Sequence, residues 1–262
     1  MKIPVSKYSA SGNDFLIFHT FKKGDRSALA KQICDPHQGL GADGLIVLLP
    51  HSELDFTWEF YNRDGSRANM CGNGARAAAL YAFTHALAGD TQRFLTGAGI
   101  ISASVQNSDV EVTLTAPKIL DKGIERLGFS WWLIDTGVPH LVSLDKGAFA
   151  LPKSELECLR HEFNANVNVA QNCAQGIALR TFERGVEDET LACGTGMAAV
   201  LLRANKEGIA PAQAVLIPAS GELLELRLAE EKIFFKGKVS KIYDTFLNFR
   251  GDPARCADSP HF

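Results

Sequence analysis

The sequence lacks the features that would place the protein in a membrane or on nucleic acid. It has 262 residues, 46% of them hydrophobic, yet no apolar run approaches the roughly 18 residues that a membrane-spanning helix needs. The stretch Met1–Val5 also lacks the charged-then-apolar layout of a signal peptide. The formal net charge is −3, and the lysines and arginines are scattered. We therefore expect a soluble, cytoplasmic protein that binds neither nucleic acid nor membranes.

Metal-binding and disulfide patterns are missing as well. The sequence has no Cys-x-x-Cys, no His-Glu-x-x-His and no paired His/Cys cluster, so we expect no metal site. Its six cysteines are irregularly spaced in a chain long enough to fold without disulfides. Four of them lack any special surroundings and are expected to be ordinary buried or surface thiols: Cys34, Cys158, Cys173 and Cys256.

The other two cysteines, Cys71 and Cys193, share an unusual local pattern. Each opens a Cys-Gly-polar-Gly turn that runs into an alanine-rich segment, and Cys193 follows Cys71 by 122 positions. The apolar segments predict two helices that begin at these turns and end near Gly89 and Gly208. A pattern repeated over this distance indicates a duplicated fold.

A cysteine at the start of a helix is a candidate nucleophile or base. The first N–H groups of a helix have no intrahelical acceptor and carry partial positive charge, which stabilises a thiolate or a bound carboxylate. The pKa of a thiol falls from about 8.5 to between roughly 3.5 and 7.5 in such surroundings. A single copy of this turn would be explained equally well as a buried structural thiol, whereas the repetition favours chemistry.

Both predicted helices are flanked by short strand-like segments. We expect strands over 45–49, 56–61 and 131–134 and shorter helices over 26–34 and 154–163. Ala116-Pro117-Lys118 marks a domain boundary. The pattern predicts an α+β fold of two pseudo-symmetric domains facing each other across a cleft, each a β-sheet or barrel wrapped around a central helix.

The segment Gly39–Gly44 has the glycine spacing of a dinucleotide-binding fingerprint. Such a site needs a strand before the glycines and a helix after them. Here a predicted helix precedes and a strand follows, so the segment is interpreted as a tight loop.

Two facing cysteines suit the inversion of a carbon centre. One group removes a proton from one face while the other supplies a proton from the opposite face. The negative charge that develops could be stabilised without a cofactor by N–H groups at the two helix starts. The residues that would supply those N–H groups are Gly72, Asn73, Gly194 and Thr195.

At these positions and others the sequence resembles the diaminopimelate epimerase family of cofactor-independent amino-acid epimerases. The resemblance covers nearly the whole chain. The motifs that carry it are Ser11–Phe15, Gly39–Gly44, Tyr61–Ser66, Met70–Gly74, Gly137–His140, Asn166-Val167, Glu183–Gly185 and Ala192–Gly196.

The resemblance implies a cytoplasmic enzyme, usually a homodimer, that interconverts LL- and meso-2,6-diaminoheptanedioate for lysine and peptidoglycan synthesis. It implies that Cys71 and Cys193 are a thiol–thiolate pair that exchange roles with reaction direction. It implies that His140 lies beside the reacting centre. It also implies that the last strand crosses back to the first domain, so the predicted domains are 1–117 with about 241–262, and 118–240. The matching substrate-binding positions are Asn13, Asn62, Asn166, Glu183 and Arg184. Arg184 suits the distal carboxylate, because a guanidinium forms a bidentate pair with it, whereas Glu183 and the amides suit ammonium groups.

One departure and four alternatives are relevant. Val138 stands where the family commonly has an asparagine that contacts the distal end of the substrate. A proline or hydroxyproline racemase of the same fold is disfavoured, since its substrate has no second carboxylate for Arg184, Asn62 and Asn166. An isomerase relative that has lost one cysteine is disfavoured by the intact pair. A non-catalytic amino-acid-binding module or a thiol redox module stays open, and a redox pair would be expected to cycle through a disulfide.

Overall fold

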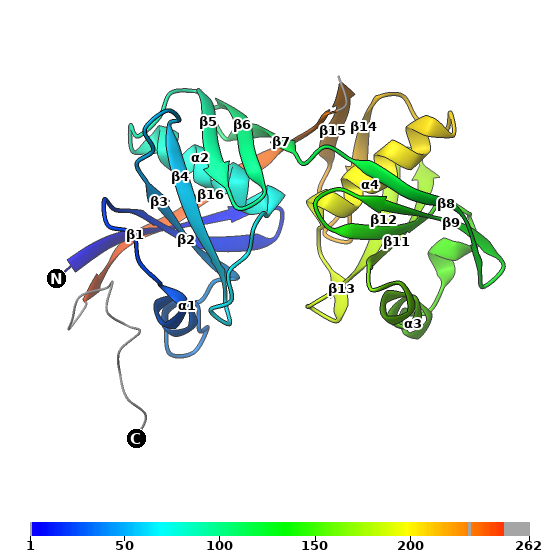
Figure 1. The fold of residues 1–262 in the computed structure, drawn as a ribbon, viewed down its shortest axis with the longest axis horizontal. Helices are drawn as coiled ribbons and strands as arrows, with labels where there is room; N and C mark the ends of the chain where they lie inside the picture. The colour runs from blue at the N-terminus through cyan, green and yellow to red at the C-terminus, as the bar shows by residue number, and fades with distance from the viewer. Residues whose placement is uncertain (1, 230–231, 249–262) are drawn as a thin grey trace. The chain divides into compact units, whose positions relative to one another are not determined.

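The computed structural model describes residues 2–229 and 232–248, so Cys256 lies outside the described residues. The chain divides into two compact units, unit 1 with Met1–Val110 and Lys238–Phe262, and unit 2 with Glu111–Gly237. Two strands, β7 (Asp109–Leu114) and β16 (Lys232–Asn248), run through the unit boundaries (Figure 1). The chain therefore changes unit within these two strands.

Unit 1 is a closed barrel of eight strands. Its strands follow the order β1-β2-β3-β4-β5-β6-β7-β16, and β16 also pairs with β1. The remaining strands are β1 (Lys2–Ala10), β2 (Asn13–His19), β3 (Gly44–Leu49), β4 (Phe56–Asn62), β5 (Thr91–Thr96) and β6 (Gly99–Gln106). The helices are α1 (Ser27–Ile33), between β2 and β3, and α2 (Gly72–Thr84), between β4 and β5.

Unit 2 has the strand order β16-β15-β14-β12-β11-β10-β9-β8, and β13 pairs with β12 outside this path. Its strands are β8 (Lys118–Arg126), β9 (Phe129–Asp135), β10 (Pro139–Ser143), β11 (Asn166–Cys173), β12 (Gly176–Glu183), β13 (Asp188–Thr190), β14 (Gln213–Ile217) and β15 (Leu224–Ala229). The helices are a short 3-10 turn (Ala148–Ala150), α3 (Lys153–Phe163) and α4 (Gly194–Lys206).

The two units repeat one topology. Strands β1 to β6 pair in the alternation antiparallel, parallel, antiparallel, parallel, antiparallel. Strands β9, β10, β11, β12, β14 and β15 pair in the same alternation. A helix connects the strands at each parallel step, as a crossover requires. The predicted duplication and the predicted α+β fold class are confirmed.

The central helices α2 and α4 are core elements on every side. In α2 all residues from Gly72 to Ala82 are buried, and the helix packs against β1, β2, β3 and β6. Helix α4 packs in the same way against β9, β10, β11, β14 and β15. The alanines explain this placement, because a helix apolar on all sides is stable only when enclosed and small side chains let strands approach closely.

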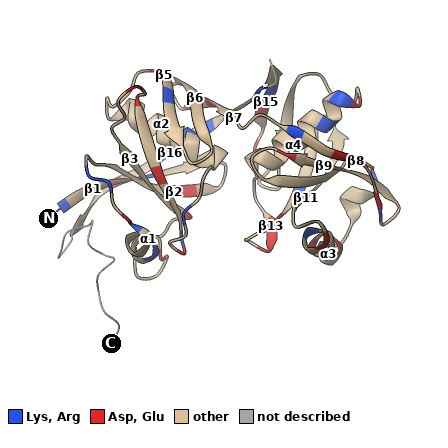
Figure 2. Cartoon of the chain, in the orientation of Figure 1, with Lys and Arg blue, Asp and Glu red and all other residues tan. Residues whose placement is uncertain are grey.

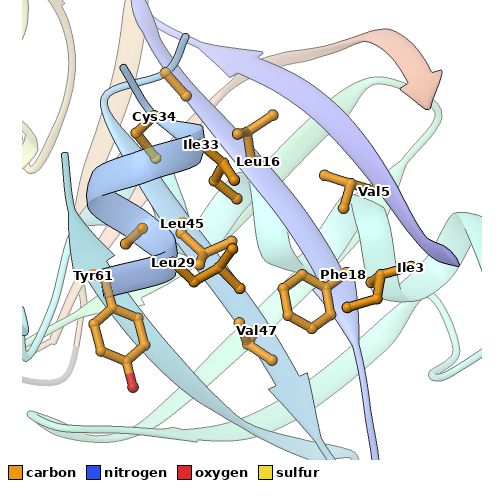
Figure 3. Packing of buried hydrophobic residues seen from close by; sticks show 12 residues of the cluster. Ile3, Val5, Leu16, Phe18, Leu29, Ile33, Cys34, Leu45, Val47 and Tyr61 are labelled. Carbon is orange, nitrogen blue, oxygen red and sulfur yellow. The ribbon is translucent and has the colours of Figure 1, made fainter. Parts of the chain in front are cut away.

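A second core lies under α1 in unit 1. Leu29 and Ile33 of this helix pack on Leu16, Leu45 and other buried side chains of the strands (Figure 3). Cys34 is buried in the same cluster, and Cys158 and Cys173 are exposed, as predicted for ordinary thiols. Helix α3 covers the corresponding strands of unit 2 with Leu156 and Leu159.

Of the two predicted helix ends, the one near Gly208 is confirmed and the one near Gly89 is wrong. Helix α4 stops just before Gly208, whose φ is +72°, as a C-terminal glycine requires. Helix α2 does not extend to Gly89. It ends at Thr84, and Ala86 takes the left-handed conformation with φ of 55°. The prediction failed because it took glycine as the mark of a left-handed residue, and here an alanine occupies that position.

The loop prediction for Gly39–Gly44 is confirmed, since α1 precedes this segment and β3 follows it. Acidic and basic residues are scattered over the elements of each unit (Figure 2). None of the helices in the described ranges combines the length and apolar character needed to cross a membrane.

Candidate active site

Both motif cysteines cap the start of a central helix. Cys71 precedes α2 in an extended conformation, and its Sγ accepts the N–H of Gly74 at 3.4 Å. Cys193 precedes α4 in the same conformation, and its Sγ lies 3.5 Å from the hydroxyl of Thr195. The predicted placement at helix starts is confirmed. The first two residues of each helix are Gly72 and Asn73, and Gly194 and Thr195, so their N–H groups have no intrahelical acceptor.

Cys193 lies beside an acidic side chain. Burial raises the pKa of the Cys193 thiol well above its usual range, and the charge of Glu183 and a hydrogen bond to it raise the pKa further. Burial raises the pKa of Glu183 as well. Glu183 ends β12, and Cys193 follows the short strand β13 that pairs with β12. Both shifts act against ionisation, so Cys193 is a thiol.

Asn13 is tied to the start of α2. It begins β2, and its Oδ1 accepts a hydrogen bond from Asn73 Nδ2 at 2.7 Å. Its own Nδ2 donates to Asp43 Oδ2 at 3.1 Å. The side chain of Asn73 thus makes a hydrogen bond within the protein. Its backbone N–H is the group that can take the predicted role of stabilising negative charge on the substrate.

Asn62 lies at the same end of the barrel. It is the last residue of β4, and its register partner in β3 is Gly44, the residue after Asp43. Its Nδ2 donates to Ser66 Oγ at 3.0 Å, and its side chain is exposed. In unit 1 the structure therefore gathers the start of β2, the start of β3 and the end of β4 at one end of the barrel.

His140 is fully buried in unit 2. Burial lowers its pKa to about 3, and the positive charge of Arg184 adds to the shift. Asn168 Nδ2 donates to His140 Nδ1 at 3.0 Å, while Thr181 Oγ1 donates to Asn168 Oδ1 at 2.9 Å. The imidazole is therefore neutral at ordinary pH, and its Nδ1 accepts a hydrogen bond from Asn168.

Asn166, at the start of β11, and Arg184, in the turn after β12, lie beside His140. Asn166 begins β11 opposite His140 in the parallel pairing with β10, and its Nδ2 lies 3.5 Å from His140 Nε2. Its Oδ1 accepts the backbone N–H of Arg184 at 2.8 Å. The guanidinium of Arg184 is exposed and donates to the carbonyl of Asn164 at 3.0 Å. Unit 2 thus brings its predicted site residues to the end of the sheet where α4 begins.

Sequence reasoning missed Asp43, Arg76 and Asn168, which bind predicted site residues directly. Asp43 stands in a segment interpreted as a loop, and Asn168 in an alternating strand, so neither carried a signal. Arg76 did carry a signal, because it is a charged residue in an alanine-rich segment and the equivalent position of the repeat is Ala198.

Gly196 shows why the repeated motif keeps its second glycine. A Cβ at this position would lie 2.3 Å from Asn168 Oδ1. The backbone of α4 therefore approaches the side chain that holds His140, and no larger residue fits between them.

The sequence matches a known protein family. A family model described as diaminopimelate epimerase matches residues 5–120 and 132–242. The chain is 59% identical over 241 residues to a diaminopimelate epimerase of a Nitratiruptor species, covering 92% of this chain and 96% of that protein. It is 48% identical to a diaminopimelate epimerase of Helicobacter pylori, covering 93% and 96%.

Solved structures with this fold are more distant in sequence. A PhzF-family phenazine biosynthesis protein of Enterococcus faecalis superposes with a TM-score of 0.75 at 16% identity, covering 95% of this chain and 100% of that chain. A hydroxyproline epimerase of Agrobacterium vitis, solved with trans-4-hydroxy-L-proline bound, has a TM-score of 0.70 at 12% identity, covering 94% and 92%. Similarity at this level shows the shared fold alone.

Proposed function

Since this chain belongs to the diaminopimelate epimerase family, and is thus an isomerase, we propose that it interconverts LL- and meso-2,6-diaminoheptanedioate. The observation that supports this most strongly is the repeated placement of a cysteine at the start of a buried central helix. An epimerase with two acid–base groups needs one such group on each face of the carbon. The duplicated topology supplies two of the same kind.

In the proposed reaction, the thiolate of one cysteine removes the α-proton and the thiol of the other delivers its proton to the opposite face. The first cysteine ends as a thiol and the second as a thiolate, so their roles are exchanged for the reverse direction. Cys193 suits the protonated role in the resting enzyme, because burial and Glu183 raise its pKa. Cys71 then serves as the base that begins the reaction.

The negative charge that develops at the α-carbon spreads onto the carboxylate beside it. We propose that the N–H groups of Gly72, Asn73, Gly194 and Thr195 stabilise this carboxylate. They belong to helix starts, where partial positive charge is fixed in place before the reaction begins. The residues present need no cofactor for this step.

The distal end of the substrate is assigned to residues with matching charge. The exposed guanidinium of Arg184 suits the distal carboxylate, with Asn62 and Asn166 as amide partners and Glu183 and Asn13 as partners for ammonium groups. Val138 removes one family amide, a loss of about 1 kcal/mol for a single hydrogen bond. His140, buried and neutral, is proposed to support the reacting centre.

We also propose a cytoplasmic homodimer that serves lysine and peptidoglycan synthesis. The family name of the relatives supports the pathway. The apolar side chains of Ile242 and Phe246 on β16 are 53% and 64% exposed. They support the homodimer, because a second copy of the chain would cover them.

Incubation with LL-diaminopimelate in D₂O tests the reaction. Solvent deuterium should enter the inverted α-carbon without added pyridoxal phosphate or metal, and the meso isomer should accumulate. Proline and trans-4-hydroxyproline serve as control substrates and should stay unlabelled. Labelling of either of these with none in diaminopimelate would overturn the proposal in favour of the racemase alternative.

A further inference from the structure

A chain of hydrogen bonds with a fixed direction runs from α2 to Asp43, the residue before β3. The guanidinium of Arg76 donates to Asn73 Oδ1 at 2.7 Å. Asn73 Nδ2 donates to Asn13 Oδ1 at 2.7 Å, and Asn13 Nδ2 donates to Asp43 Oδ2 at 3.1 Å. Each residue thus accepts from the previous one and donates to the next.

The two ends of this chain set its direction. A guanidinium can only donate, and an ionised carboxylate can only accept. Arg63 Nη2 donates to the other oxygen of Asp43 at 2.6 Å, and the N–H of Asp14 donates to Asp43 Oδ2 at 3.2 Å. If either amide between the ends turned over, it would place N–H against N–H or oxygen against oxygen. The amides of Asn73 and Asn13 therefore have one permitted orientation each.

Arg76 is not required by the helix itself. Its side chain is 0% exposed and also donates to Ser11 Oγ at 2.6 Å and to the carbonyl of Lys238 at 3.3 Å. Burial of a guanidinium is unfavourable unless its hydrogen bonds are made. The corresponding position of the other central helix is Ala198, so the repeated fold accommodates alanine there. Packing of the helix therefore does not explain why unit 1 has an arginine at this position.

We propose that Arg76 is a positioning residue that, through Asn73, fixes which edge of the Asn13 amide meets the substrate. This inference rests on the proposed function, in which Asn13 contacts the substrate. After its two internal bonds, Asn13 keeps one N–H and one oxygen lone pair for a ligand. The lone pair accepts from an ammonium and the N–H donates to a carboxylate, which are the two charged groups of an α-amino acid.

Substitutions at Asn73 and Arg76 of the full chain test the direction of the chain. Asn73→Asp keeps a partner for Arg76 but cannot donate, so Asn13 must turn over and KM should rise about tenfold or more. Arg76→Gln can accept as well as donate and should raise KM in the same way. Arg76→Lys still only donates and should keep KM within about threefold of the wild-type value.

Arg203→Gln is the matched control. Arg203 is equally buried in α4, but it donates to the backbone carbonyls of Val142 and Ser130 at the other end of that helix. Its loss should lower the melting temperature and leave KM unchanged. Wild-type epimerisation of diaminopimelate is measured first, so failure of the proposed function is recognised separately. An unchanged KM in Asn73→Asp, or an Arg76→Lys variant as impaired as Arg76→Gln, would overturn the inference. If Arg76→Gln does not fold, the Asn73→Asp result decides.

Discussion

Cys71 and Cys193 occupy equivalent positions of a repeated fold but have different neighbours. Cys71 is half-buried and its sulfur accepts a backbone N–H, whereas Cys193 is buried beside Glu183 and Thr195. A helix start favours a thiolate, and burial next to a carboxylate favours a thiol. The helix start is common to both residues, so the surrounding side chains are what distinguishes the two thiols.

We expect Cys71→Ala and Cys193→Ala each to stop epimerisation, because each removes one of the two acid–base groups. The rate should fall by at least roughly 100-fold, the scale of a lost general acid or base. Chiral separation of the diaminopimelate isomers measures it, and circular dichroism shows that the variants are folded. Cys158→Ala, on an exposed position of α3, should keep full activity. Normal turnover in either motif variant would contradict the two-base reaction.

His140 makes the stability of the protein depend on pH. Its pKa is about 3 in the folded protein and about 6.5 in an unfolded chain. Between these values the unfolded chain binds a proton that the folded protein does not, so the free energy of unfolding falls as pH decreases. The contribution is fully present above pH 6.5 and is lost at about 1.4 kcal/mol per pH unit below it.

Urea unfolding of the wild-type protein and His140→Gln between about pH 7 and pH 4 measures this contribution. The difference between their free energies of unfolding should shrink as the pH decreases, because glutamine does not titrate. Parallel curves for His140→Gln and the wild type would show that His140 titrates normally in the folded protein.

At the scale of elements, the ends of α2 and α4 match bond for bond. The N–H groups of Ala86 and Leu87 donate to the carbonyls of Phe83 and Ala82. Residues 122 positions later do the same, with Gly208 and Ile209 donating to Asn205 and Ala204. Both ends are Schellman motifs, in which one residue must be left-handed. The duplicated fold kept the motif, although only the second copy has a glycine there.

This difference predicts opposite effects for a pair of substitutions. Ala86→Gly should stabilise the protein by roughly 1 kcal/mol, because glycine takes the left-handed conformation without strain. Gly208→Ala should destabilise it by a similar amount, purely through the backbone, because its Cβ would meet no atom within 4 Å. Thermal unfolding measures both changes. Equal signs for the two substitutions would contradict the assignment of Ala86 as a strained residue.

At the scale of the molecule, strands β7 and β16 carry the chain from one unit to the other. β16 pairs with β15 of unit 2 near Phe235 and with β1 of unit 1 from Val239 onward. Its second part presents Ile242 and Phe246 at the surface of a closed barrel, where no free strand edge explains them. This surface is the one that we expect a second copy of the chain to cover.

Phe246→Asp should weaken the proposed homodimer, since a carboxylate would be buried in an apolar contact. We expect the dissociation constant to rise at least about tenfold, measured by sedimentation equilibrium. Phe21→Asp is the control, because Phe21 is also an exposed phenylalanine of unit 1, at 87% exposure, and lies outside β16. A wild-type protein that sediments as a monomer would contradict the proposed homodimer.

The sequence by itself determined the repeated elements. Helix starts, strands and the two cysteine turns follow from short-range rules, namely apolar periodicity, capping and glycine turns, and these act between residues a few positions apart. Cys71, Cys193 and the N–H groups after them were therefore placed correctly. The exception was Gly89, where alanine took a conformation that propensity assigns to glycine.

Only the tertiary structure decided the contacts of those residues. The partners Asn13 and Asp43, Asn73 and Asn13, and Cys193 and Glu183 are joined through strand pairing or across a helix–sheet contact. Their sequence separations carry no period that a pattern could reveal. Burial, which sets the pKa directions of His140 and Cys193, is a property of the assembled barrel and belongs to no local segment. The kinds of residues at the site were thus written in the sequence, and their protonation and orientation were fixed by the fold.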